Sequence, residues 1–79
     1  MSSPTTSRIK ADVPYRFKLT DREFEILSRI VEGQSNPQMA SALYLSLNTI
    51  KSHVNSILNK LGVNDRVQAA VFAVRNQLV

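Results

Sequence analysis

The chain lacks the residues that most small catalytic and metal-binding sites need. Its 79 residues include no cysteine, one histidine and two glycines. Without cysteine there is no disulfide framework, no thiolate metal site and no cysteine redox switch. His53 stands alone as a candidate ligand, and the two glycines, Gly33 and Gly62, each end a helix and so form no Gly-rich phosphate loop. We therefore expect no bound metal and no cofactor.

Acidic residues are also few, and their spacing does not suit catalysis. The sequence has six Asp and Glu against ten Lys and Arg. Glu23 and Glu25 are two residues apart in a helical pattern, so they point to different faces and do not form an acid–base pair. No carboxylate cluster follows His53. We expect no catalytic residues and no enzyme activity, and we expect Glu23 to cap a helix.

Long apolar runs are absent as well. No segment approaches the roughly 20 apolar residues that cross a bilayer, and residues 1–6 carry no hydrophobic stretch of the secretory type. The expected location is therefore the cytoplasm. A net charge of +4 favours polyanionic partners, either nucleic acid or an anionic membrane surface.

Residues 1–18 are expected to form a flexible basic tail, ahead of one domain at residues 19–79. The tail holds two of the three prolines, several Ser and Thr, and a net charge of +3. Such a composition rarely orders by itself, although Tyr15 and Phe17 are candidates for packing back onto the domain. A solvated tether is the simpler interpretation, and a basic arm that touches DNA is the alternative. Membrane binding is poorly supported because the tail is not amphipathic.

From Leu19 onward the pattern predicts an all-α fold, a compact four-helix bundle. The first helix begins with a capping box, Thr20 to Glu23, and ends at Gly33. The second opens at Ser35 with Gln38 three residues later and Pro37 in its first turn. The apolar faces expected for these two helices are Phe24, Leu27, Ile30 and Val31, then Met39, Ala40 and Leu43.

The third and fourth helices are predicted from similar signals. Ser46 is the expected N-cap of the third, and Gly62 ends it. Its apolar stripe is the clearest in the chain: Ile50, Val54, Ile57, Leu58 and Leu61. The fourth helix starts near Asn64 and Asp65 and has two apolar faces, one with Val67, Ala70, Val71, Val74 and Leu78, the other with Ala69, Phe72 and Ala73. One face is enough for the core, so the second face calls for a partner.

The second and third helices have the form of a helix-turn-helix. About three residues join them, and the small side chain of Ala40 lets them pack closely. The second helix of such a motif enters the DNA major groove. A merely solvated face is the alternative, but this face has no carboxylate, whereas ordinary exposed faces mix charge signs. Acidic residues gather instead on the first helix, which carries a net −2, while the chain from Gly33 onward carries +3.

These residues resemble the LuxR/FixJ-type helix-turn-helix, the DNA-binding output domain of many bacterial regulators. The resemblance covers essentially all of residues 19–79. The matching positions are Leu19-Thr20, Arg22-Glu23, Glu25-Ile26-Leu27, Gly33, Ser35-Asn36, Met39-Ala40, Leu43, Leu45-Ser46, Thr49-Ile50-Lys51, His53, Lys60-Leu61-Gly62-Val63, Arg66 and Ala69.

The resemblance implies a recognition helix that begins at Leu47. Residue by residue, it implies that Thr49 and Lys51 contact DNA backbone or bases and that Ser52 and Asn55 vary with the target. His53 is expected to have a structural or backbone-contact role. The complete set of predicted DNA-binding residues is Asn48, Thr49, Lys51, Ser52, His53, Asn55, Ser56, Asn59 and Lys60. The sequence departs from the family at two positions. Pro37 replaces the basic or polar residue that is usual there, and Asn55 lies where many relatives carry a basic residue.

The resemblance also implies partners. The fourth helix is expected to form a two-fold interface through Val67, Ala70, Val71 and Val74, giving a homodimer on double-stranded DNA. RNA polymerase is a further candidate partner. Most relatives carry a receiver or ligand-binding domain ahead of this one. The competing hypothesis is a protein–protein adaptor that sequesters a related regulator by heterodimerisation through the same helix.

Overall fold

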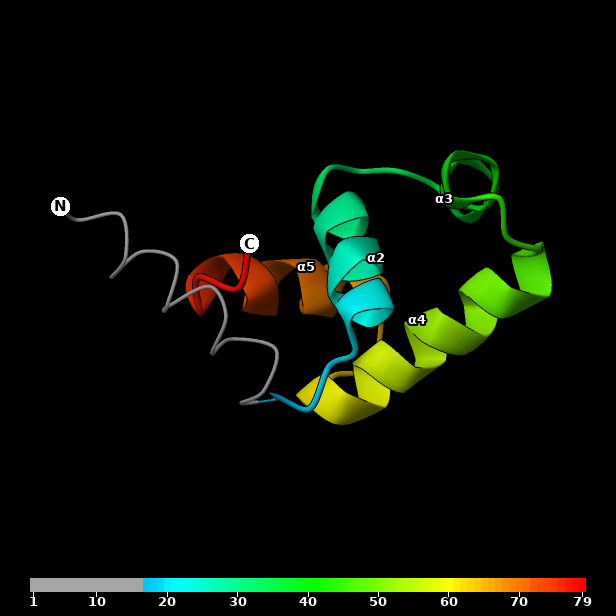
Figure 1. Ribbon diagram of the computed structural model, residues 1–79. Coiled ribbons are helices and arrows are strands. Elements are labelled where there is room, and N and C mark those ends of the chain that lie inside the picture. Colours follow the sequence, from blue (N-terminus) through cyan, green and yellow to red (C-terminus); the bar gives the residue numbers. More distant parts are fainter. Residues whose placement is uncertain (1–16) are drawn as a thin grey trace, which may run out of the picture.

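The computed structural model describes residues 17–79, and this part of the chain is all helical (Figure 1). The helices are α2 (Asp21–Val31), α3 (Asn36–Leu43), α4 (Leu47–Leu61) and α5 (Arg66–Arg75). The expected four-helix, all-α architecture is confirmed. The expectations for residues 1–16, including Tyr15, lie outside the described residues.

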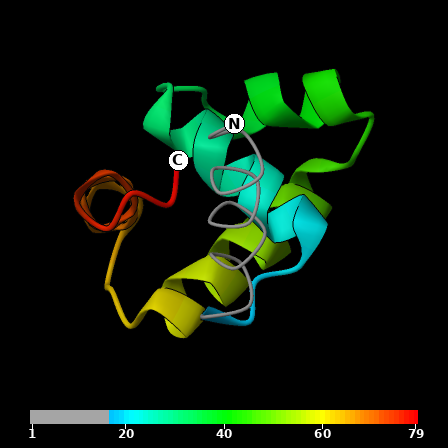
Figure 2. The same cartoon turned by 60° about the vertical axis from the view of Figure 1, so that its left-hand side comes forward.

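Helix α2 packs against both α4 and α5, and α4 packs against all three other helices. Figures 1 and 2 show α5 on one side of α2 and α3 on the other, with α4 running past the end of α2. Helix α3 and the N-terminal half of α4 therefore lie together on one side of α2 (Figure 1).

Each helix starts where the sequence predicted it. Thr20 and Ser35 form complete capping boxes with Glu23 and Gln38, because each cap side chain accepts a backbone N–H and each partner side chain accepts the cap's own N–H. Ser46 caps α4 and Asp65 caps α5 in the simpler one-sided way. These bonds satisfy backbone donors that have no partner within the helix.

All four helices have a left-handed residue at or just after their C-terminal end: Gly33, Tyr44, Gly62 and Gln77. Gly33 follows α2 with φ of 89°, and Gly62 ends α4 with φ of 71°, as expected of glycine. Helix α3 instead ends at Tyr44, with φ of 57°. A tyrosine at such an angle is uncommon, because its Cβ lies close to the backbone. Its side chain is 94% exposed, so side-chain packing does not compensate for this conformation.

The core lies where α2, α4 and α5 meet, with one contribution from α3. Its fully buried large side chains are Ile26, Leu27, Met39, Ile50 and Ile57. Ile26 was not part of the face predicted for the first helix, whereas Phe24 and Val31 are only half-buried. Ile26 is buried because α2 is covered on two sides, by α4 and by α5, so its apolar face is wider than one stripe.

The position predicted for Leu78 on the last helix is wrong. We expected it on the same face as Val67 and Val74, but it is buried in the core at 3% exposure. The helix ends at Arg75, and Gln77 takes a left-handed φ of 56°. The Leu78 backbone N–H then donates to the Ala73 carbonyl at 2.8 Å. The chain folds back, and the helical spacing no longer applies to Leu78.

Candidate nucleic-acid interface

Helices α3 and α4 form a compact two-helix unit joined by residues 44–46. Met39 on α3 and Ile50 on α4 are both fully buried, and the half-buried Ala40, Leu43 and Leu45 pack against the core. The Leu45 backbone N–H donates to the Ala40 carbonyl at 2.9 Å, which closes the turn. The two helices form the predicted helix-turn-helix: their connection is short, Ala40 is small, and the second helix is capped.

The polar residues of α4 lie in two stripes rather than one. The first, which we call the outer stripe, is exposed and consists of Asn48, Lys51, Ser52, Asn55 and Asn59. Their spacing of three and four residues places them on one side of the helix, opposite the buried Ile50, Val54, Ile57 and Leu61. The outer stripe carries one positive charge, Lys51, and no carboxylate.

The second stripe, which we call the flank stripe, lies between the outer stripe and the core. Its members are half-buried: Thr49, His53, Ser56 and Lys60. Thr49 belongs to the helix cap, because its backbone N–H donates to Ser46 Oγ at 3.0 Å and its Oγ1 accepts from the Ser46 hydroxyl at 2.9 Å. The flank stripe therefore has contacts within the protein that the outer stripe lacks.

The carboxylate of Glu23 accepts hydrogen bonds from three other residues. It is buried at 4% exposure. Lys60 Nζ donates to its Oε1 at 2.6 Å, Ser56 Oγ donates to its Oε2 at 2.5 Å, and the Thr20 N–H donates to its Oε1 at 2.9 Å. Lys60 also donates to the Lys18 carbonyl at 2.8 Å. One carboxylate thus caps α2 and holds the C-terminal half of α4.

This environment changes the acidity of Glu23. Burial of the carboxyl is the largest single influence and raises its pKa. Hydrogen bonds from Lys60, Ser56 and Thr20, together with the charge of Lys60, outweigh it and lower the pKa from 4.5 to about 2. Glu23 is therefore ionised throughout the neutral range, and the ion pair with Lys60 is intact there.

The structure thus divides the predicted DNA-binding residues. Ser56 and Lys60 are turned toward α2 because Glu23 accepts hydrogen bonds from both, whereas the side chains of the outer stripe are exposed. The sequence predicted the capping role of Glu23, which is confirmed, but not its second role. Glu23 is separated from Ser56 by 33 residues and from Lys60 by 37, and no local pattern indicates a pairing over such distances.

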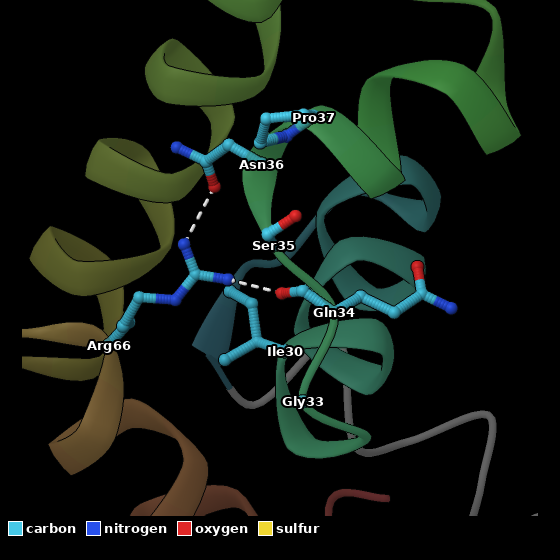
Figure 3. A pocket seen from close by; sticks show the side chains of 7 residues that line it. All are labelled: Ile30, Gly33, Gln34, Ser35, Asn36, Pro37 and Arg66. Atoms are coloured by element: carbon cyan, nitrogen blue, oxygen red, sulfur yellow. Dashed lines mark hydrogen bonds between the residues drawn. The ribbon is translucent and has the colours of Figure 1, made fainter.

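Arg66 provides a second long-range link that the sequence did not predict. Figure 3 shows its guanidinium reaching from the start of α5 to the segment between α2 and α3. It donates to Asn36 Oδ1 and to the Gln34 carbonyl, both at 2.7 Å. The contact holds the first turn of α3 beside α5, next to an open cavity of about 480 Å³.

The expected positive surface after Gly33 counted four cations, but Lys60 and Arg66 are both bonded within the protein. Lys51 and Arg75 remain exposed. The cationic side chain available on the outer face of α4 is therefore Lys51.

The outward face of α5 is apolar. Val67, Val71 and Val74 are 69%, 47% and 57% exposed, and Ala70 is half-buried. A shallow groove of about 350 Å³ runs along this helix, lined in part by Val63, Val67 and Val71. On the inner side Ala69 and Ala73 are fully buried, as expected, and Phe72 stacks edge-on against Phe17 with ring centroids 5.3 Å apart.

Other kinds of site find little support in the part of the chain that the structure describes. Residues 17–79 contain no group of three or more His, Cys, Asp or Glu side chains placed to hold a metal ion. Within the same range, every helix is too short or too polar to traverse a bilayer.

Comparison with known proteins adds a family match. Residues 18–73 match the family described as bacterial regulatory proteins, luxR family. Among curated relatives, the transcriptional regulatory protein LiaR of Bacillus subtilis is 51% identical over 61 residues, which is 77% of this chain and 29% of LiaR. The response regulator protein VraR of Staphylococcus aureus is 42% identical over 73 residues, covering 92% of this chain and 35% of VraR.

A solved structure agrees with the sequence matches. The crystal structure of the response regulator ChrA, from a heme-sensing two-component system, superposes with a TM-score of 0.72 at 40% sequence identity. The similarity covers 76% of this chain and 30% of ChrA. The chain thus spans about a third of the length of the relatives that it matches.

Proposed function

Because the chain belongs to the luxR family of bacterial regulatory proteins, a family of DNA-binding regulators, we propose that it binds double-stranded DNA sequence-specifically through the outer stripe of α4. One observation carries the proposal. At the projecting edge of the helix-turn-helix, five exposed polar side chains lie on one face with a single cation and no carboxylate. Such a surface is compatible with the negative charge of DNA, and its amides and hydroxyls suit base edges.

The proposed geometry places α4 in the major groove. The groove is about 12 Å wide and admits one α-helix. In this position Lys51 donates to a guanine edge or a phosphate, and Asn48 and Asn55 pair with adenine. Thr49 and His53, on the flank stripe, lie toward the phosphate backbone. Ser56 and Lys60 keep α4 at a fixed angle on α2 through Glu23 and do not reach the DNA.

We further propose that two copies bind together through α5. The exposed valine face needs an apolar partner, since a contiguous apolar patch on a small domain marks an interaction site. A two-fold arrangement presents the same face twice and predicts an inverted repeat. The half-sites should lie about one helical turn apart or closer. Pairing compensates for the single cation of each outer stripe, because two linked contacts multiply the apparent affinity.

Substitution of Lys51 tests the proposed surface. Lys51→Ala should weaken binding to duplex DNA by about tenfold, because it removes a charge-assisted contact. Arg22→Ala is the matched control, since it removes one exposed positive charge from α2 rather than from α4. Both variants should melt like the wild type. Equal affinities of wild type and Lys51→Ala would remove Lys51 from the interface.

The adaptor hypothesis remains the second candidate, and the exposed valines of α5 favour it. In that case the chain sequesters a related regulator and does not itself hold DNA. Absence of DNA retention at low salt, together with tight binding to a full-length relative, would establish it. Retention of duplex DNA by the isolated chain would exclude it as the main function.

A further inference from the structure

The exposed large apolar side chains of residues 17–79 fall into two places. Val67, Val71 and Val74 lie on α5, with Val79 close behind at the end of the chain. The other two, Tyr44 and Leu47, lie at the turn that leads into α4. The proposed dimer face accounts for the α5 group, but the proposed DNA contacts do not include Leu47, which is 45% exposed.

Leu47 lies in register with the outer stripe. It is the first residue of α4, one turn before Lys51 and two turns before Asn55. Residues four apart lie above one another on the same face, and helical side chains tilt toward the N-terminus. Leu47 therefore lies one turn ahead of Lys51 of the outer stripe, in the part of a recognition helix that contacts base edges.

Fold stability does not explain a leucine at this position. The first turn of a helix is stabilised by acidic side chains, which interact with the positive end of the helix dipole. Helix α4 has none there, and Leu47 leaves 45% of its surface exposed. A carboxylate at this point would repel phosphates, whereas an apolar side chain is compatible with a groove that contains an apolar group.

We infer that Leu47 contacts the C5-methyl group of a thymine, and that each half-site therefore has a T·A pair beside the base pair that Lys51 contacts. In the major groove the thymine methyl is the apolar group on the base edges, and a side chain without donors or acceptors can discriminate only through it. Tyr44 lies before the helix and out of register with the stripe, so the inference concerns Leu47 alone. It rests on the proposed DNA binding and specifies one base within the site.

Deoxyuridine substitution tests this contact, because uracil lacks only the methyl group. Binding sites are first selected from a random duplex library with the wild-type chain. Each thymine of the selected half-site is then replaced singly by deoxyuridine, and affinities are measured for wild type, Leu47→Ala and Val79→Ala. Val79 is the matched control, since it is apolar and similarly exposed at 46% but lies outside α4.

Replacing one particular thymine by deoxyuridine should weaken wild-type binding about fourfold, because the replacement removes one buried methyl group. For Leu47→Ala, the same replacement should leave the affinity unchanged. For Val79→Ala, it should weaken binding as much as it does for the wild type. The inference is overturned if no thymine shows a penalty with the wild type, or if Leu47→Ala retains the penalty in full. Failure of the wild type to bind any duplex at low salt overturns the proposed function as well, so the two failures are distinguishable.

Discussion

Replacement of Glu23 by glutamine tests how α4 is held on the bundle. The substitution keeps the shape of the side chain but removes the charge that pairs with Lys60 at 2.6 Å. The pKa of Glu23 is lowered from 4.5 to about 2, and a pKa difference between folded and unfolded chain is a difference in stability. At about 1.4 kcal/mol per pH unit, the ionised carboxylate contributes about 3 kcal/mol. We expect Glu23→Gln to cost about 2–3 kcal/mol at pH 7, since the amide still accepts some of the hydrogen bonds.

The pH dependence gives a sharper test than the size of the effect. The folded pKa lies below the unfolded value, so the unfolded chain binds more protons between pH 4.5 and 2, and stability falls as the pH falls. The contribution of Glu23 is complete above pH 4.5 and is lost as the pH approaches 2. The stability difference between wild type and Glu23→Gln should therefore be constant near neutrality and shrink across this window.

Urea unfolding followed by circular dichroism measures these free energies directly. Glu25→Gln is the matched control: Glu25 is about half exposed, and its ion pairs with Arg22 and Arg29 are 3.9 and 3.5 Å long. Exposed pairs of this kind contribute about 0–1 kcal/mol. An equal cost for the two substitutions, or a Glu23→Gln cost that does not change between pH 5 and pH 2, would refute the reasoning.

Substitutions at three further positions test the local backbone and the Arg66 contact, all by urea unfolding. Tyr44→Asn should raise the free energy of unfolding by about 0.5 kcal/mol, because asparagine tolerates the left-handed φ of 57° and the exposed tyrosine ring contributes no packing. Gly62→Ala should lower it by about 1 kcal/mol through strain at φ of 71° alone, since an added Cβ meets nothing within 4 Å. Arg66→Ala should lower it by about 1–2 kcal/mol by removing two charge-assisted hydrogen bonds, and Arg66→Lys should recover only part of this, because lysine lacks the planar fork. A destabilised Tyr44→Asn, a neutral Gly62→Ala or a full rescue by Arg66→Lys would each contradict its argument.

The fold was predictable from the sequence to the extent that its signals are local. Caps at Thr20, Ser35, Ser46 and Asp65 act within three residues, so their side chains are visible in the sequence. The period of α4 likewise identified its buried stripe. The end of α5 was not predictable in this way, because Gln77 adopts a left-handed angle that its side chain does not favour.

The candidate site was predictable only as a face of one helix. Helical spacing separates polar from apolar residues, but it does not distinguish the exposed outer stripe from the half-buried flank stripe. That distinction depends on which neighbour lies beside α4. Glu23 on α2 binds Ser56 and Lys60, and Arg66 binds the segment before α3, through contacts that span 30 residues or more. Such contacts are set by the packing of the helices and have no signature in the sequence.

The central claim is that the outer stripe of α4 binds duplex DNA, and the salt dependence of binding tests it most directly. Fluorescence anisotropy of a labelled mixed-sequence duplex, titrated at several salt concentrations, gives the affinity as a function of salt. The account predicts that log affinity falls linearly with log salt, and that Lys51→Ala reduces the slope by about one if Lys51 contacts a phosphate, or leaves the slope but lowers the affinity if it contacts a base. Absence of binding at low salt, or a Lys51→Ala variant identical to the wild type in both affinity and slope, would contradict it.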